Sequence, residues 1–297
     1  MKTNAWKEKF MQGVFLVAAC TSVLAVALIC FFLLVNGIPA MKEIGFIQFI
    51  TGDIWKPNNE LFGIFPMIVG SLYVTAGAII FGVPIGILTS IFMAMYCPKV
   101  LYKPLKAATE LLAGIPSVIY GFFGLVVLVP LMRQLGWQLK AAGVVRTSGN
   151  GNSILTASLL LGMMILPTII GVTESAIRAV PKHYYEGALA LGATHERSIF
   201  TVVLPAAKSG VVAGIVLGIG RAIGETMAVI MVAGNQPWIP KSIMQGVRMM
   251  TANIVIEMGY ATDLHRGALI ATGVVLFVFI LIINLSVTLL KRRSEHE

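Results

Sequence analysis

Six stretches of mostly apolar residues, each long enough or nearly long enough to cross a lipid bilayer, dominate this sequence. A helix needs about 20 apolar residues to cross the hydrocarbon core. Apolar residues make up 57% of the chain and charged residues only 12%, a balance far from that of a soluble domain. We predict an all-α integral membrane protein with six membrane-spanning helices, at about residues 14–35, 66–95, 108–131, 153–177, 206–234 and 267–290.

The lysines and arginines of the predicted loops indicate how these helices are oriented. They are more frequent in the loops on the side of both chain ends than in the longer loops on the other side. Cytoplasmic loops carry the excess of positive charge, so we expect both termini to be cytoplasmic. The first apolar run, Val14 to Val35, is longer than the core of a signal peptide and is interpreted as a spanning helix. The formal net charge of +9 is explained by this topology, and we expect no nucleic-acid partner.

The sequence lacks the motifs of several other function classes. No Gly-x-x-x-x-Gly-Lys-Ser/Thr phosphate loop occurs, so the chain is not expected to hydrolyse ATP by itself. The 3 cysteines and 4 histidines show neither zinc-ligand nor disulfide spacing. We therefore expect a non-catalytic chain without a metal or a cofactor. Active transport through it would need energy from a partner or from an ion gradient.

The predicted cytoplasmic loop between the fourth and fifth spans has its own local structure. Pro181 is suited to open a short helix, and Gly192 is suited to end it in a left-handed conformation. Thr194 is suited to cap a second short helix, and Pro205 then redirects the chain into the membrane. The pattern alone leaves two interpretations, a solvated connector with interfacial tyrosines or a docking element for a cytoplasmic partner.

The same loop resembles the Glu-Ala-Ala signature of the membrane subunits of ATP-binding-cassette importers. Two positions depart conservatively from this signature, with Gly187 in place of an alanine and Val202 in place of an isoleucine. The resemblance implies a type I importer (MetI-like) permease fold, in which this loop forms a coupling helix that seats on the ATPase subunit. The implied coupling residues are Glu186, Gly187, Ala188, Gly192, Leu204 and Pro205.

Two further stretches narrow the resemblance. "LLAGIPSVIYGFFGL" (111–125) and "GIGRAIGETMAVIMVAGN" (218–235) are similar to the permeases of the bacterial phosphate importer, and the stretch at 218–235 resembles the PstC-type subunit. The resemblance covers about residues 61–290, so we expect an N-terminal helix and loop at 1–60 and a permease domain at 61–297. It implies a location in the bacterial plasma (inner) membrane. The implied partners are a PstA-like permease, a PstB-like ATPase dimer and a PstS-like external phosphate-binding protein.

The stretch at 218–235 places two full charges inside a predicted spanning helix. Counted along a continuous helix over 206–234, Arg221 lies near the membrane midplane, where a lipid-facing arginine is costly. A guanidinium binds phosphate oxygens in a bidentate manner, so we expect Arg221 to contact the anion in transit. Glu225, at i+4, is expected to hold Arg221 in the resting state. The alternative is an interhelical ion pair that only stabilises the bundle.

Other polar positions are assigned weaker roles. Pro116 is expected to break or kink the third span, and Ser117 is a candidate phosphate contact beside the freed backbone. Glu174 and Arg178 are expected to form a structural pair or a cytoplasmic gate. Two alternative functions stay open at this point. One is a permease for another oxyanion such as sulfate or molybdate, and the other is a channel or secondary transporter that works without an ATPase.

Overall fold

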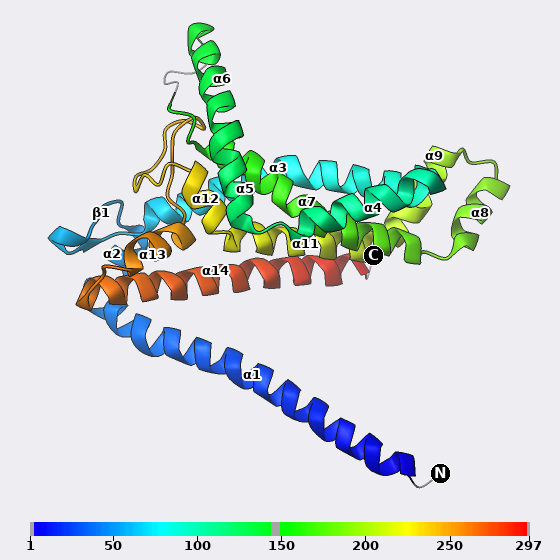
Figure 1. The fold of residues 1–297 in the computed structure, drawn as a ribbon, viewed down its shortest axis with the longest axis horizontal. Helices are drawn as coiled ribbons and strands as arrows, with labels where there is room; N and C mark the ends of the chain where they lie inside the picture. The colour runs from blue at the N-terminus through cyan, green and yellow to red at the C-terminus, as the bar shows by residue number, and fades with distance from the viewer. Residues whose placement is uncertain (1–2, 144–148, 296–297) are drawn as a thin grey trace.

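A layer of long helices forms the centre of the computed structural model, which describes residues 3–143 and 149–295. Residues 1–2, 144–148 and 296–297 lie outside this description. Helix α7 packs between α3 and α11, and α14 packs along α11 on the other side (Figure 1). The bounds of these helices are α3 Phe65–Ile91, α7 Ile154–Ala179, α11 Lys208–Gly224 and α14 Asp263–Glu295.

The remaining elements surround this layer. Near the start of α14 lie the end of α1 Thr3–Ile44, then α2 Phe46–Thr51, η1 Pro57–Asn59, α13 Met250–Met258 and an antiparallel pair of short strands, β1 Trp55–Lys56 and β2 Leu61–Phe62. Helix α4 Lys99–Gly114 precedes the third candidate span, which contains α5 Ser117–Phe123, η3 Gly124–Leu128 and α6 Val129–Ala141. Helix α12 Met227–Val232 packs on α5. The predicted coupling loop contains α8 Lys182–Ala190, α9 His195–Ser198, η4 Ile199–Val203 and α10 Leu204–Ala206, and η2 Phe92–Tyr96 extends α3.

The two ends of the bundle are distinct. Figure 1 shows the beginning of α1 and the end of α14 on the same side as α8, whereas α13 and the β1–β2 pair lie on the opposite side. We call these the α8 end and the α13 end. The arrangement agrees with two termini on one side of a membrane. That this side is the cytoplasm stays a prediction.

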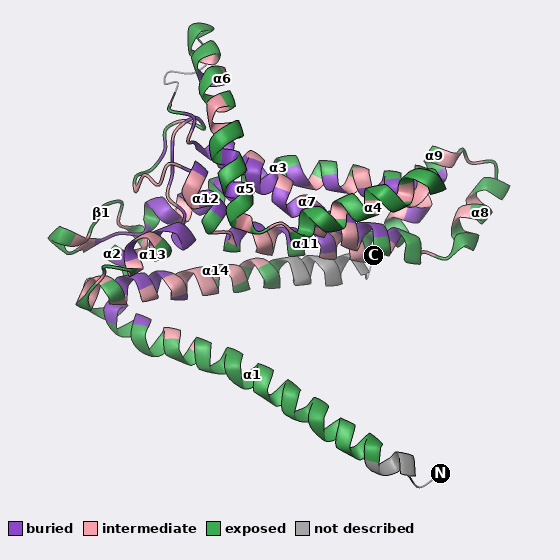
Figure 2. Cartoon of the chain, viewed as in Figure 1, coloured by how far each residue is buried: buried purple, intermediate pink, exposed green. Residues whose placement is uncertain are grey.

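The prediction of several membrane spans is confirmed. Among the described residues, 5 helices are long and apolar enough to cross a bilayer, and a bent pair, His195–Ala206 with Lys208–Gly224, brings the total to 6. The pair bends by 71° next to Ala207, just after the predicted turning point at Pro205. Helix α1 is exposed along most of its length (Figure 2) and meets α14 where Gly37 approaches Val274.

The helix predicted over 108–131 is broken at Pro116, as expected, and the candidate span begins only after the break. Ile115 (φ −69°, ψ 125°) and Pro116 (φ −58°, ψ 142°) are both extended, because proline cannot donate a backbone hydrogen bond and disfavours a helical residue before it. Helix α4 therefore ends at Gly114, and the apolar segment Ser117–Ala141 leaves the central layer and projects to one side (Figure 1).

The prediction of one continuous fifth helix over 206–234 is wrong. Helix α11 ends at Gly224, Glu225 is extended (φ −69°, ψ 136°), and α12 begins at Met227. The Glu225 side chain accepts a hydrogen bond from the N–H of Ala228 at 3.3 Å. It thus satisfies one of the backbone donors that the start of a helix leaves free. Glycine, a poor helix former, precedes the break.

Glycines allow α11 to pack closely on α7. A Cβ added at Gly214 would lie 2.9 Å from Thr173 Oγ1, and one at Gly218 would lie 2.9 Å from Ile169 Cγ1. Such contacts are possible only where the helix backbones approach each other directly. The other face of α11 is different, because a Cβ at Gly220 or Gly224 would meet no described atom within 4 Å. The small-residue stripe of α11 therefore packs on one face only, and the face at Gly220 is open.

Candidate functional site

The candidate transport site lies at two backbone breaks, one just before the candidate span Ser117–Ala141 and one just after α11. The breaks at Ile115–Pro116 and at Glu225–Thr226 are each followed by a short helix, α5 or α12. These two helices pack so closely that a Cβ at Gly121 would lie 2.9 Å from Ala228 Cα. Irregular backbone within a membrane is tolerated only where protein or a water-filled cavity surrounds it. The paired breaks therefore mark a place where polar groups are available inside the bundle.

Arg221 lies in the last turn of α11, just before the second break. Its Nη1 donates to Thr168 Oγ1 of α7 at 3.3 Å, and the side chain is half-buried. The carbonyl end of a helix attracts positive charge, so this position stabilises a guanidinium without an acidic partner. The long hydrogen bond to a neutral hydroxyl leaves most of the guanidinium donors available for an anion.

Glu225 does not hold Arg221 in this structure, which contradicts the expected resting pair. Within 3–143 and 149–295, the ion pairs are centred on two other carboxylates, Glu174 and Glu257. The reason is the break itself, because a residue beyond the end of α11 is no longer at the i+4 helical position. The Glu225 carbonyl also accepts a hydrogen bond from Thr251 Oγ1 of α13 at 2.9 Å, which ties the break to the α13 end.

Ser117 is the first residue of α5 and is half-buried. Across the break before it, Tyr120 Oη donates to the carbonyl of Leu112 at 2.9 Å. This contact satisfies a carbonyl that the end of α4 leaves free. In the described part of the chain, no hydrogen bond or ion pair joins Ser117, Arg221 and Glu225 to one another. The structure packs α5 against α12, the helix that follows α11 and Glu225, without connecting the three side chains.

The predicted coupling loop is a helix–turn–helix with its expected local signals. Gly192 has φ +85°, the left-handed conformation that ends α8, and Thr194 Oγ1 accepts a hydrogen bond from the N–H of Arg197 at 3.3 Å. Tyr185 Oη and His195 Nδ1 hydrogen-bond and hold the two short helices together. Both helix boundaries predicted from Gly192 and Thr194 are therefore confirmed.

The outer surface of this loop is unusually exposed. Helix α8 has no buried residue, and Glu186 and Gly187 are exposed while Ala188 is half-buried. Leu191 is 91% exposed, although it is apolar and lies beyond the end of the spanning helix α7. Leu204 and Pro205 belong to α10, where the chain turns back toward the bundle. Tyr184 and Leu189 of α8 are also exposed, and a group of exposed apolar side chains is a feature of a docking surface.

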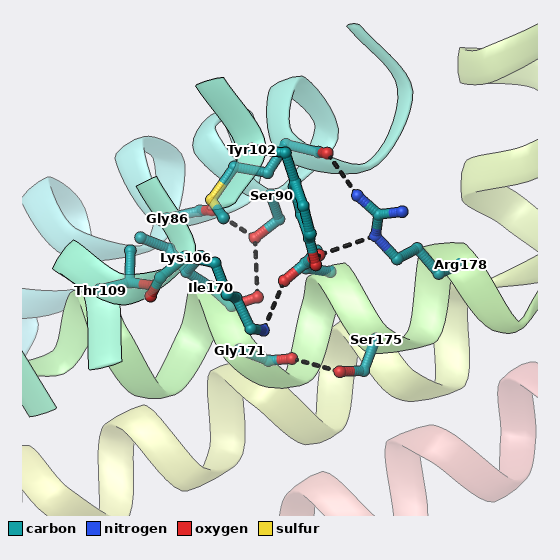
Figure 3. Close-up of polar contacts among 11 residues, drawn as sticks. Gly86, Ser90, Tyr102, Lys106, Thr109, Ile170, Gly171, Ser175 and Arg178 are labelled. Atoms are coloured by element: carbon teal, nitrogen blue, oxygen red, sulfur yellow. Dashed lines mark hydrogen bonds and ion pairs between the residues drawn. The ribbon is translucent and has the colours of Figure 1, made fainter. Parts of the chain in front are cut away.

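A carboxylate cluster at the α8 end fixes α4 to α7 (Figure 3). Glu174 is 1% exposed and accepts hydrogen bonds at 2.7 Å from Tyr102 Oη, Lys106 Nζ and Arg178 Nε. The Arg178 guanidinium also donates to the Met93 carbonyl at 2.8 Å. The predicted Glu174–Arg178 pair is thus confirmed. It is one part of a larger network that ties three segments together.

The same carboxylate shifts the titration of two residues of α4. The hydrogen bond to Glu174 raises the pKa of the Lys106 ammonium above its ordinary value, because it stabilises the charged form. The pKa of the Tyr102 hydroxyl is also raised, because the neutral hydroxyl donates to Glu174. Both partners were missed by sequence reasoning, because they lie 72 and 68 residues from Glu174 in the chain.

A second carboxylate cluster, also missed, lies at the α13 end. Glu257 accepts hydrogen bonds from Trp55 Nε1 at 2.8 Å and Arg248 Nη1 at 2.5 Å, and pairs with His265 Nε2 at 2.9 Å. These residues line a cavity of about 650 Å³. The cluster joins β1, α13, α14 and the segment before α13. In the described ranges, no group of three or more His, Cys, Asp and Glu side chains is arranged to hold a metal ion.

Comparisons with known proteins agree with this geometry. Residues 86–296 match the family described as "Binding-protein-dependent transport system inner membrane component". The probable ABC transporter permease protein YqgH of Bacillus subtilis is 37% identical over 286 residues, 92% of this chain and 89% of the relative. The phosphate transport system permease protein PstC of Mesorhizobium japonicum is 37% identical over 254 residues, 82% of this chain and 77% of the relative.

Solved structures share the fold at lower identity. A chain of the inward-facing MetNI methionine ABC transporter superposes with a TM-score of 0.59 at 20% identity, covering 81% of this chain and 99% of that chain. A chain of the bacterial ABC transporter that imports alginate gives 0.59 at 17% identity, covering 98% and 99%. The type I importer permease architecture predicted from the sequence is confirmed.

Proposed function

Because this chain belongs to the family of binding-protein-dependent transport system inner membrane components, we propose that it is the PstC-type permease subunit of an ATP-driven phosphate importer. It is a non-catalytic, multi-pass subunit of the bacterial inner membrane, and a separate ATPase hydrolyses ATP. It forms half of the translocation pathway. The similarity to permeases named for phosphate transport supports the choice of cargo.

The observation that carries this proposal is the protruding loop at the α8 end. Its helix α8 is exposed, with the left-handed Gly192 and the exposed Leu191 at its end, whereas Ile199 and Val203 anchor the loop on the bundle. We infer that Glu186, Gly187, Ala188, Gly192, Leu204 and Pro205 form the ATPase-coupling element. The partners are then a PstA-like permease, a PstB-like ATPase dimer at the α8 end and a PstS-like binding protein at the α13 end, which places both termini in the cytoplasm.

We further infer that the cargo passes the two helix breaks. Arg221 offers a permanent positive charge with a planar set of donors that matches phosphate. Glu225 and Ser117, on the two breaks, complete the proposed pathway. In this structure Glu225 caps α12, so its role is to hold the break open beside Arg221. The ion-pair role expected from the sequence is not needed for this proposal.

Replacement of Gly192 tests the coupling role. Gly192→Val places a β-branched residue at φ +85°, where left-handed backbone costs about 1–2 kcal/mol, so α8 should lose its fixed end. We expect weaker co-purification of the ATPase and loss of transport-stimulated ATP hydrolysis, with a normal yield of the permease. Gly143→Val is the matched control, because it places the same residue at a left-handed backbone position (φ +73°) outside this loop, where a Cβ would meet no described atom within 4 Å. Wild-type coupling in Gly192→Val would contradict the proposal.

Competition for uptake tests the cargo. The complete complex, reconstituted in vesicles with its binding protein, should accumulate labelled phosphate when ATP is present. Arsenate should compete and sulfate should not. A preference for sulfate or molybdate would assign the chain to another oxyanion. Uptake without nucleotide would instead support a channel or a secondary transporter.

A further inference from the structure

A groove on the outside of the bundle, close to the α13 end, lies apart from the proposed pathway. It is a cavity of about 480 Å³ between α3, the beginning of α7 and the loop 240–243. Its walls are mainly apolar and open to the surroundings, with Ile80 68% exposed and Ile243 58% exposed. Large apolar side chains on an exposed groove mark a surface that a ligand, a protein or lipid covers.

The groove is a built feature. The N–H groups of Ile154 and Leu155, which the start of α7 leaves free, donate to the carbonyls of Gln245 at 2.9 Å and Ile243 at 3.0 Å. These bonds fix the loop onto the helix. At the floor, Gly77 faces Ser158 directly, so that α3 and α7 are in close contact. The groove therefore exists before anything occupies it.

Its length matches one leaflet of a bilayer. The α3 residues that line it extend from Tyr73 to Phe81, which is about 12 Å along a helix. Half of the hydrocarbon core is about 15 Å thick. An acyl chain lying in the groove would thus be covered over most of the depth of the leaflet at the α13 end.

The mouth of the groove is polar and positively charged. Lys241 and Ser242 line it from the loop, and the exposed Tyr73 lines it from α3. None of the lining residues is acidic. Lysine and tyrosine are typical of the membrane interface, where the lysine ammonium reaches the lipid headgroups. The charge complements a phosphodiester, whereas the partner helix of another subunit would present an apolar surface.

We propose that this groove binds one anionic phospholipid, such as phosphatidylglycerol, with an acyl chain against α3 and α7 and the headgroup phosphate at Lys241. The assignment is independent of the transported cargo. It identifies a lipid site between the loop 240–243 and the spanning helices.

Photo-crosslinking in native membranes tests which molecule occupies the groove. A benzophenone amino acid is placed at Ala76, an exposed lining residue, in the full chain expressed with its partners. Mass spectrometry should find a phospholipid adduct on the chain. The same probe at Val100, which is 85% exposed and outside the groove, is the control and should give less of this adduct. A crosslink from position 76 to a second polypeptide would overturn the proposal.

Lipid retention tests the charge. Native mass spectrometry of the purified complex should show more bound phosphatidylglycerol than phosphatidylcholine. Lys241→Gln should lower retention of phosphatidylglycerol about fivefold, the effect of one lysine near an anionic surface. Lys56 is a matched control, because it is an exposed lysine that lines another cavity. Lys56→Gln should leave the retention of phosphatidylglycerol unchanged. Ala76→Phe fills the groove and should lower retention of both lipids. Equal retention by wild type, Lys241→Gln and Ala76→Phe would overturn the proposal.

Discussion

Two arginine–glutamate pairs, Glu174 with Arg178 and Arg221 with Glu225, each have a spacing of four residues, but only one of them forms an ion pair. Glu174 and Arg178 are both on the continuous helix α7 and form an ion pair at 2.7 Å. Arg221 lies in the last turn of α11 and donates to a threonine hydroxyl, whereas Glu225 lies beyond the helix and caps α12. Spacing alone therefore does not determine an ion pair. The helix must continue between the two residues.

The difference separates a structural charge cluster from a site that is available to a ligand. The Glu174 carboxylate receives hydrogen bonds from three side chains, so its charge is compensated within the protein. The Arg221 guanidinium has one long hydrogen bond to a neutral group. A partly buried cation with unused donors favours binding of an anion. We interpret the first pair as an anchor for α4 and the second as part of the pathway.

The largest expected effect is on uptake and follows from replacing Arg221. Arg221→Gln should reduce phosphate uptake to the background of empty vesicles, because the amide lacks the charge that compensates the anion. Arg221→Lys should restore part of the uptake, since an ammonium keeps the charge and loses the planar donor set. Transport by the reconstituted complex, its yield and its melting temperature are measured together.

The double variant Arg221→Gln/Glu225→Gln distinguishes this role from a structural pair. A structural pair predicts that the double variant recovers stability and uptake, because no buried charge is left without a partner. A cargo contact predicts that uptake stays at background while the complex still assembles. Recovered uptake would exclude an obligatory contact between Arg221 and phosphate.

The next effect is on stability and concerns the compensated pair. Glu174→Gln leaves Lys106 and Arg178 facing each other without the carboxylate. The free energy of unfolding should fall by about 2–3 kcal/mol. This loss is smaller than for a fully buried ion pair, because both cations are partly exposed. The melting temperature of the purified permease should fall. Glu196→Gln, an exposed acid on α9, should leave it unchanged. An unchanged melting temperature in Glu174→Gln would contradict the anchoring role.

The features of this structure differ in how far the sequence predicts them. Apolar run length predicted that the chain has several spans, but not all of their bounds. The break at Pro116 followed from the chemistry of one residue. The end of α8 and the cap of α9 followed from Gly192 and Thr194 for the same reason, because each signal is local.

The break after Gly224 could not be predicted in this way. None of Gly224, Glu225 and Thr226 prohibits a helix, and the extended conformation is held partly by a hydrogen bond from Thr251, 26 residues away. Tyr102 and Lys106, which bind Glu174, and Trp55, which binds Glu257, come from distant segments as well. Tertiary contacts decide such features, and local propensity does not encode them.

A smaller effect tests whether the break itself is needed. Gly224→Ala raises helix propensity by about 1 kcal/mol, and a Cβ there meets no described atom within 4 Å. The substitution should extend α11 toward Glu225 and lower uptake a few-fold without loss of yield. Gly220→Ala is the matched control, because it is equally open and lies within the helix, before the break. Equal uptake by the two variants would show that the break is not functional.

The smallest effect is expected from pH, and it concerns only the Glu174 cluster. The hydrogen bond to Glu174 raises the pKa of Lys106 above its ordinary 10.5, so the contribution of this contact is complete below that value and is lost as pH rises through the raised pKa. Tyr102 acts in the same direction, since its pKa is raised above 10.0. The melting temperature should therefore show no pH dependence from these two groups between about pH 6 and pH 9 and should fall at higher pH.

Lys106→Met should start from a lower melting temperature, and its melting temperature should fall less at alkaline pH. The contrary result is a loss of stability near neutral pH in wild type that Lys106→Met does not show. This result would contradict the raised pKa values of the cluster.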